Sequence, residues 1–137
     1  MTVDRVFLDA NVLFSLAYGS SGLARLWELA KKGKCLLLAS HYVIEEARRN
    51  LHHPAQLERL ENFLADLQIV LEADRRLPCP IELPQKDWPV LMAAIYAKAD
   101  FLLTGDRQHF GRHFGQTVGG VKICMPRHYL LNTHQAC

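Results

Sequence analysis

The feature that most constrains the fold of this chain is an alternation of short apolar runs with segments whose apolar residues recur every three or four positions. The short runs occupy residues 3–9, 35–39, 68–72, 101–104 and 121–124. Nearly continuous apolar runs of this length are typical of strands that are buried on both faces. The alternation therefore predicts an α/β fold, a three-layer α/β/α sandwich around a central, mostly parallel sheet of five strands.

The segments between the runs indicate helices, because their apolar residues follow the i, i+3, i+4, i+7 spacing of an amphipathic helix. Helices are expected in residues 23–30, 43–51, 57–67 and 87–95. Ser40 is placed to cap the second of these helices. Three prolines make residues 73–86 an irregular surface connection, and the five glycines of 105–120 indicate a loop.

The length of 137 residues predicts one domain, which we place at residues 1–131, followed by a short unstructured tail at 132–137. No apolar run approaches the roughly 18 residues that a membrane-spanning helix needs. Asp4 and Asp9 interrupt the N-terminal segment where a signal peptide requires a continuous apolar core. We therefore expect a cytoplasmic protein that does not associate with membranes.

The four cysteines lie far apart in the sequence, at positions 35, 79, 124 and 137. They form no CxxC pair, and they are too few for a small domain held together by disulfides. We expect them to be reduced thiols.

Two acidic residues directly follow expected strands. Asp9 ends the first strand, and Asp106 comes two residues after the strand at 101–104. In open parallel sheets, ligands bind beyond the carboxyl ends of the strands, at the point where the strand order reverses. If the later strands add on the other side of the first one, Asp9 and Asp106 become neighbours. Asp4 and Asp100 precede their strands and should lie at the opposite edge.

The helix that follows Ser40 carries two adjacent acids, Glu45 and Glu46. Successive helical residues point about 100° apart, which places Glu46 at the margin of the apolar face and Glu45 toward water. Glu45 is then free to pair with Arg49, four residues later. Glu46 is the expected site residue, and Glu45 is the alternative in the other register.

Asp87 immediately precedes Trp88, Pro89 and an expected helix, so it fits equally well as a helix N-cap or as a ligand. Carboxylates that meet without partners repel one another and raise each other's pKa, unless divalent cations neutralise them. Oxygen donors without His or Cys favour Mg²⁺ or Mn²⁺ over zinc. Ions of this kind support the metal-assisted hydrolysis of phosphodiesters.

Four sequence blocks, in this order, resemble the PIN-domain nucleases, in particular the toxin-like, VapC-type members of bacterial toxin–antitoxin systems. The blocks are FLDANVLFS at 7–15, SHYVIEEA at 40–47, DWPVLMAA at 87–94 and ADFLLTGD at 99–106. The resemblance spans residues 3–131, and each block alone would be a weak signal. It implies a metal-dependent ribonuclease that uses Mg²⁺ or Mn²⁺ and acts on single-stranded or structured RNA. The acids that it implies as catalytic and metal-binding residues are Asp9, Glu46, Asp87 and Asp106.

The resemblance also implies a polar residue two positions after the first acid and a hydroxyl before the last one. In this sequence they are Asn11 and Thr104. Each has an ordinary alternative, since Asn11 can cap a turn and Thr104 can be a simple strand former. We expect both to orient Asp9, Asp106 or a metal-bound water, and Ser15 is a further candidate for this role.

The charge balance is compatible with RNA binding once the four acids are set aside. The net charge of the chain is +2, and without those acids 16 basic residues face 10 acidic ones. Arg107, next to Asp106, is the expected substrate contact.

The repeat HFGRHFG at 109–115 has two interpretations. It is a flexible loop whose phenylalanines Phe110 and Phe114 pack under the sheet, or one in which His109 or a phenylalanine stacks on an unpaired base.

The sequence thus favours an endoribonuclease, with RNA as substrate and Mg²⁺ or Mn²⁺ as cofactor. The main alternative is a PIN-like module that binds RNA or protein without cutting it. A phosphatase-like enzyme with Asp9 as nucleophile is a third class, but such enzymes usually carry a second acid where this chain has Asn11. The resemblance further implies a homodimer and a small antitoxin partner that inserts into the acidic groove.

Overall fold

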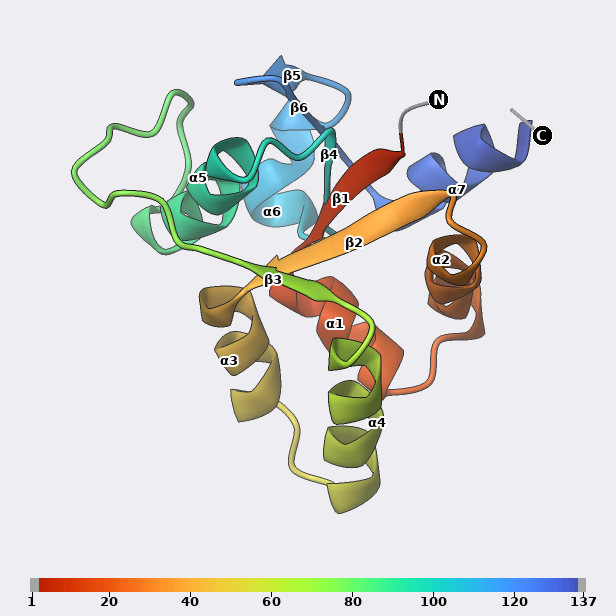
Figure 1. The fold of residues 1–137 in the computed structure, drawn as a ribbon. Coiled ribbons are helices and arrows are strands. Elements are labelled where there is room, and N and C mark those ends of the chain that lie inside the picture. The colour runs from red at the N-terminus through yellow and green to blue at the C-terminus, as the bar shows by residue number, and fades with distance from the viewer. Residues whose placement is uncertain (1–2, 136–137) are drawn as a thin grey trace.

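In the computed structural model, which describes residues 3–135, a six-stranded sheet runs through the molecule with helices on either side (Figure 1). Its spatial order is β3-β2-β1-β4-β6-β5. The strands are β1 (Asp4–Leu8), β2 (Cys35–Ser40), β3 (Gln68–Val70), β4 (Phe101–Leu103), β5 (Thr117–Val118) and β6 (Val121–Cys124). The α/β fold with a mostly parallel central sheet is confirmed.

β1 lies inside the sheet because both of its neighbours pair with it in parallel. Val6 is opposite Leu37 of β2 on one side and opposite Phe101 of β4 on the other. Strand order therefore reverses at β1, as the placement of Asp9 beside Asp106 requires. Right-handed crossovers that run in opposite directions from β1 place their helices on opposite faces of the sheet.

The sheet has one strand more than the five expected. β5 is only two residues long and pairs antiparallel with β6, with Val118 opposite Val121. The turn between them consists of Gly119 and Gly120, with φ of 56° and 85°. Two residues at positive φ make the tight hairpin turn whose twist matches the strands, and glycine adopts it without strain.

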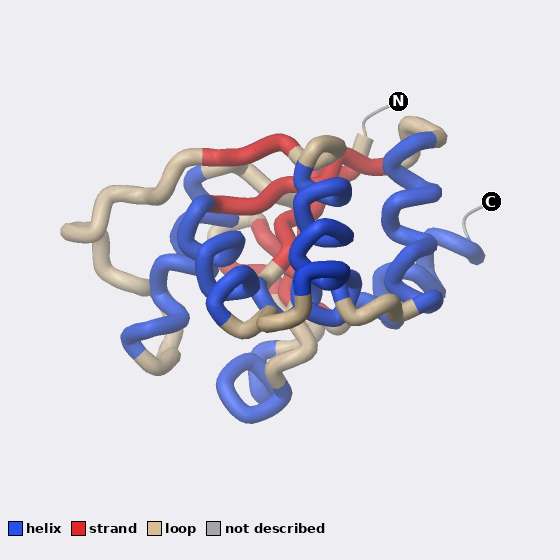
Figure 2. The backbone as a smooth tube through the Cα atoms, turned by 90° about the horizontal axis from the view of Figure 1, so that it is seen from below, coloured by secondary structure: helices blue, strands red, loops and turns tan. Residues whose placement is uncertain are grey.

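The helices α1, α3 and α4 lie together on one side of the sheet, and α5 and α6 lie on the other (Figure 1). Seen from the first side, the helices stand in front of the strands (Figure 2). The helical elements are α1 (Ala10–Ala17), α2 (Ser21–Lys31), α3 (His41–Arg49), α4 (Pro54–Leu64), η1 (Gln85–Asp87), α5 (Trp88–Tyr96), α6 (Arg107–Phe110), η2 (Gly111–His113) and α7 (Pro126–Gln135). None of the helices in the described part of the chain is both long and apolar enough to span a bilayer.

Two of these helices differ from the expectation. α1 follows β1 after a single residue, where no helix was expected, because no glycine or proline separates it from the strand and its apolar residues continue the run of β1. α7 extends through residues 132–135, which were expected to belong to a tail. Its buried residues Tyr129 and Leu130 anchor its first part in the core. Residues 136–137 lie outside the described part, and the domain limit at residue 131 stays a prediction.

The loop expected after β4 is also more regular than the glycines suggested. Asp106 caps α6, and a single turn of η2 follows before Gly115 leaves the helix at a φ of 88°. Phe110 is fully buried and Phe114 packs against the core, as one of the two interpretations expected. His113 contacts Gln116 and the carbonyl oxygen of Glu82 at 3.1 Å each, which ties this segment to the 73–86 connection.

The cysteines of the described part are free thiols, as expected: Cys35, Cys79 and Cys124. Burial raises the pKa of Cys35 and of Cys124 to about 11. Cys137 lies outside the described residues.

We expect Cys35 and Cys124 to resist alkylation by iodoacetamide at pH 8 in the folded protein. A pKa of about 11 leaves roughly one thiol in a thousand as the reactive thiolate. Peptide mass spectrometry should find both modified only after denaturation. Labelling of either one at the rate of a small-molecule thiol would show that the core strands open readily.

Candidate functional site

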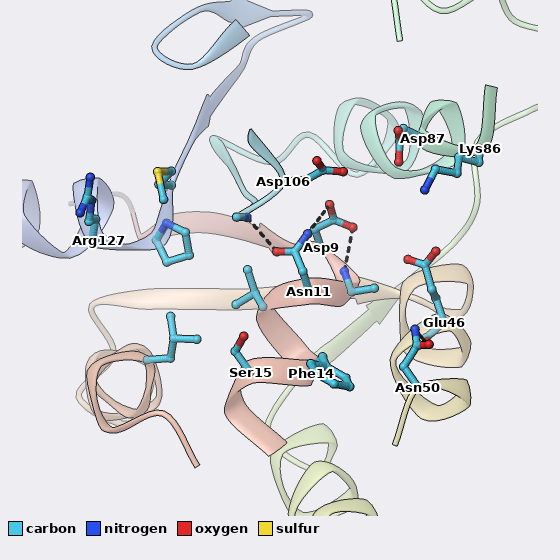
Figure 3. A pocket seen from close by; sticks show the side chains of 16 residues that line it. Asp9, Asn11, Phe14, Ser15, Glu46, Asn50, Lys86, Asp87, Asp106 and Arg127 are labelled. Carbon is cyan, nitrogen blue, oxygen red and sulfur yellow. Dashed lines mark hydrogen bonds between the residues drawn. The ribbon is translucent and has the colours of Figure 1, made fainter. Parts of the chain in front are cut away.

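A pocket of about 730 Å³ lies beyond the carboxyl ends of β1 and β4. All four acids that the sequence indicated line it, from four separate elements of the chain. They are Asp9 after β1, Glu46 on α3, Asp87 at the end of η1 and Asp106 before α6. Their carboxylates point into one shared space (Figure 3). We call this pocket, with these four acids, the acidic pocket.

Asp9 is the most firmly held of the four acids. It is 4% exposed and caps α1, with Oδ1 accepting a 2.7 Å hydrogen bond from the backbone N–H of Ala10. Its Oδ2 accepts from the hydroxyl of Thr104 at 2.9 Å and from Nδ2 of Asn11 at 3.2 Å. Burial raises the pKa of Asp9 to about 6, although the bonds from Thr104 and Ala10 oppose the rise. The charges of Glu46 and Asp87 add to it.

Asn11 and Thr104 connect the ends of β1 and β4 through a network of hydrogen bonds. Asn11 Nδ2 also donates to Thr104 Oγ1 at 3.2 Å, and its Oδ1 accepts from the N–H of Gly105 at 2.8 Å. Thr104 Oγ1 accepts from the N–H of Asp106 at 3.1 Å. The two side chains thereby fix Asp9 relative to the backbone that leads into Asp106. Figure 3 shows the hydrogen bond between Asn11 and Asp9.

Asp87 occupies the N-cap position of α5 but makes no capping hydrogen bond with its side chain. Its backbone is helical because it ends η1, and a cap needs extended geometry to turn its oxygen onto the helix. The residue is 8% exposed, and its Oδ2 is buried without a hydrogen bond. Burial raises the pKa of Asp87, while His109 and Lys86 lower it and Asp106 and Glu46 raise it.

Glu46 lines the acidic pocket, whereas Glu45 does not line it and forms an ion pair. The partner of Glu45 is Arg48, not Arg49 as expected, because Arg48 also bridges to Glu61 on α4 at 2.8 Å. α3 is held toward Asp87 by the hydroxyl of Tyr42, which donates to the carbonyl oxygen of Lys86 at 2.5 Å.

Ser40 stands at the N-cap position of α3, but its hydroxyl makes no capping bond there. The residue is completely buried at the end of β2, and its Oγ has no hydrogen-bond partner. The expected side-chain cap is therefore absent from this helix. Asp4 and Asp100 lie away from the pocket, as expected: Asp100 accepts from the N–H of Arg5, and Asp4 accepts from the hydroxyl of Tyr129.

The other predicted site residues divide into two groups. Ser15 lines the pocket from α1, below the acids in the view of Figure 3. Arg107 is exposed on α6 and is absent from the residues that line the pocket.

Three residues that the sequence analysis did not single out as parts of the acid site belong to it or border it. Lys86 and Arg127 are the basic side chains that line the pocket, with Arg127 across it from Glu46 (Figure 3). Nδ1 of His109 lies 2.8 Å from Oδ2 of Asp106 and 2.9 Å from Oδ2 of Asp87. Arg127 follows the end of β6, so the strand-end argument that found Asp9 could have found it too.

The residues present fit a divalent cation. Four carboxylates share one pocket, two of them with pKa values that burial raises, and Asp87 Oδ2 is buried without a hydrogen bond. Bringing together like charges in this way is unfavourable unless a cation neutralises them. Oxygen donors of this type hold hard divalent ions.

Comparison with known proteins identifies the class. A family model described as "PIN domain" matches residues 5–108. The chain therefore belongs to the PIN-domain family. A search of curated proteins finds no match.

Among solved structures, a chain of VapBC2 from Rickettsia felis, crystallised with a DNA fragment from its promoter, superposes with a TM-score of 0.61. It is 17% identical, and the match covers 87% of this chain and 96% of that one. VapC20 of Mycobacterium tuberculosis, described as a toxin that cleaves the sarcin-ricin loop, superposes with a TM-score of 0.53. It is 13% identical, with coverage of 80% and 95%. At these identities, the likeness establishes the shared fold.

We expect Asp9→Asn to stabilise the metal-free protein at pH 7. A folded-state pKa of about 6, above the usual 3.8, means that folding costs free energy once Asp9 is ionised. The unfolding free energy should therefore fall as pH rises from about 4 to about 6, by at most about 3 kcal/mol. Loss of one acceptor for Asn11 should reduce the gain from the substitution to about 1–2 kcal/mol.

Urea unfolding in the presence of a chelator measures this difference at pH 4 and pH 7. Asp66→Asn, which removes an exposed acid outside the pocket, is the matched control and should change little at either pH. A variant at Asp9 that is no more stable than wild type at pH 7 would contradict the conclusion that burying the charge of Asp9, beside other acids, costs stability.

Proposed function

We propose that this protein is a metal-dependent endoribonuclease that hydrolyses phosphodiester bonds in RNA. The convergence of Asp9, Glu46, Asp87 and Asp106 in one open pocket is the observation that carries the proposal. The PIN-domain membership and the fold shared with VapC20 support it. We propose Mg²⁺ or Mn²⁺ as the cofactor, held by these four carboxylates.

When bound, such an ion would polarise the phosphate and lower the pKa of a water molecule that attacks phosphorus. The residues of the chain supply the geometry for this chemistry. Asn11 and Thr104 hold Asp9 in one orientation, so that its charge is already in place before substrate arrives. Asp106 is fixed through its backbone N–H, which donates to Thr104, and through Oδ1, which accepts from the N–H of His109.

Lys86 and Arg127 are the residues that we propose to contact the phosphates of RNA. They line the same pocket as the acids from different elements, next to Asp87 and across from Glu46 (Figure 3). A phosphate chain crossing the pocket would meet positive charge on each side of the acids. Contacts of this kind are electrostatic and make binding weaken with salt. Arg107, on exposed α6, remains a proposed contact for RNA outside the pocket.

We further propose that the protein is the toxin of a toxin–antitoxin pair. The fold similarity to VapC20 and to a chain of VapBC2 supports this role. The proposed partner is a small antitoxin with a segment that enters the acidic pocket, and the proposed assembly is a homodimer in the cytoplasm. Copurification with the product of a neighbouring small reading frame would test the pairing.

We expect Asp9→Asn or Asp106→Asn to lower the rate of RNA cleavage by about a hundredfold or more. Each change removes one negative charge at nearly constant shape, and charge stabilisation at such a site is worth several kcal/mol. The assay follows cleavage of labelled RNA with added Mg²⁺ or Mn²⁺, and circular dichroism checks the fold. Glu46→Gln should also lose activity.

Glu45→Gln is a matched control on the same helix and should retain activity, because Glu45 is paired with Arg48 outside the pocket. Equal cleavage by wild type, the acid variants and a chelated sample would reject the nuclease. RNA binding without metal-dependent cleavage would instead identify a non-catalytic binding module.

A further inference from the structure

The imidazole ring of His109 borders the acidic pocket and lies close to two of its carboxylates. Nδ1 of His109 is 2.8 Å from Oδ2 of Asp106 and 2.9 Å from Oδ2 of Asp87. The three atoms are the only set of three His, Cys, Asp or Glu donors in the described part of the chain that lie close enough together to hold one ion, all within 4.8 Å of one another.

These contacts are ion pairs when the imidazole is protonated, but the contact between His109 and Asp87 does not have hydrogen-bond geometry. Asp87 Oδ2 and His109 Nδ1 are both buried, and neither has a hydrogen-bond partner despite the short distance between them. An N–H at Nδ1 lies in the ring plane and can point along one direction only, and here it points well at neither carboxylate oxygen. Two buried polar atoms that lie this close without a hydrogen bond indicate a ligand that would contact both of them.

The spacing suits ligands of a metal ion. Two donors at adjacent corners of an octahedron with bonds of about 2.1 Å lie about 3.0 Å apart. The two measured separations, 2.8 and 2.9 Å, are close to that edge length. With its proton on Nε2, His109 has a free lone pair on Nδ1, the atom that lies 2.8 and 2.9 Å from the two carboxylate oxygens.

The local structure holds His109 in this place. Its backbone N–H donates to Oδ1 of Asp106 at 3.0 Å, which fixes the histidine relative to that carboxylate and leaves Oδ2 turned to the ring. The next residue, Phe110, is fully buried and anchors α6 to the core. Asp87, at the start of α5, places its Oδ2 2.9 Å from the ring nitrogen Nδ1.

We propose that His109 is a nitrogen ligand of the divalent cation, together with Asp87 and Asp106, and that it makes the site prefer a first-row transition-metal ion to Mg²⁺. This inference deepens the proposed nuclease function and depends on it only for its biological meaning. The oxygen donors expected from the sequence suit Mg²⁺ and Mn²⁺ equally well. Imidazole binds Mg²⁺ poorly and binds the transition-metal dications well. A nitrogen ligand therefore makes the site bind Mn²⁺ more tightly than Mg²⁺.

Isothermal titration of metal-free protein with Mn²⁺ and separately with Mg²⁺ tests the preference without any activity measurement. We expect wild type to bind Mn²⁺ more tightly. His109→Ala should weaken Mn²⁺ binding by about tenfold or more. Removing a residue that only hydrogen-bonds to a metal ligand already lowers metal affinity by about that much. Its Mg²⁺ affinity should change by less than about threefold, because that ion relies on oxygen donors.

Pulsed electron paramagnetic resonance of bound Mn²⁺ gives a second readout. Wild type should show modulation from a coordinated ¹⁴N nucleus, and both His109→Ala and His109→Asn should lose it. His109→Asn places an oxygen where Nδ1 was, so it should bind Mg²⁺ at least as well as wild type. His52→Ala, at an exposed histidine outside the pocket, is the matched control and should behave as wild type.

Absence of the ¹⁴N signal in wild type, or equal losses of both ions in His109→Ala, would overturn the proposal. Tighter Mn²⁺ binding by His109→Ala would also overturn it. That result would show that a protonated imidazole pairs with the carboxylates and competes with the metal ion. Failure to bind either ion overturns it as well. If the ¹⁴N signal is present but the protein cuts no RNA, only the proposed nuclease function is rejected. If the protein cuts RNA but shows no ¹⁴N signal, only the proposal about His109 is rejected.

Discussion

The structure of the site depends on holding like charges together. Asp9 is buried beside three other acids; burial raises its pKa, and the charges of Glu46 and Asp87 raise it further. The neutral groups Thr104, Asn11 and the N–H of Ala10 oppose the cost by donating hydrogen bonds to its carboxylate. No cationic side chain donates a hydrogen bond to Asp9 among the described residues. The charge is therefore left available for a ligand.

The parallel pairing of β1 and β4 makes this arrangement possible. Leu8 lies opposite Leu103, and the N–H of Asp9 donates to the carbonyl oxygen of Leu103 at 3.1 Å. The next residues on both strands are then Asp9 and Thr104, which lie side by side without further adjustment. The short DxN and TGD segments are thus two halves of one structure, joined by the hydrogen bonds of Asn11 to Gly105 and Thr104.

The parts of the site that the sequence predicted are those set by strand ends and helix faces. Asp9 and Asp106 follow from the rule for parallel sheets, and Glu46 follows from the 100° step that separates it from Glu45. His109 and Lys86 could not be found in this way, because their positions depend on the paths of α6 and of the 73–86 connection. α1 was not predicted because its apolar residues continue the run of β1 with no glycine or proline between them, and β5 was not predicted because two residues carry no pattern.

The hydrogen bond from Thr104 to Asp9 joins residues 95 positions apart. β1 receives its second neighbour only when β4 is present, and the acids that follow these two strands, Asp9 and Asp106, are far apart in the sequence. During synthesis, a ribosome must therefore release more than three-quarters of the polypeptide before these carboxylates can meet. A chain that ends before β4 contains Asp9, Glu46 and Asp87 but lacks Asp106, so it cannot form the complete acidic pocket.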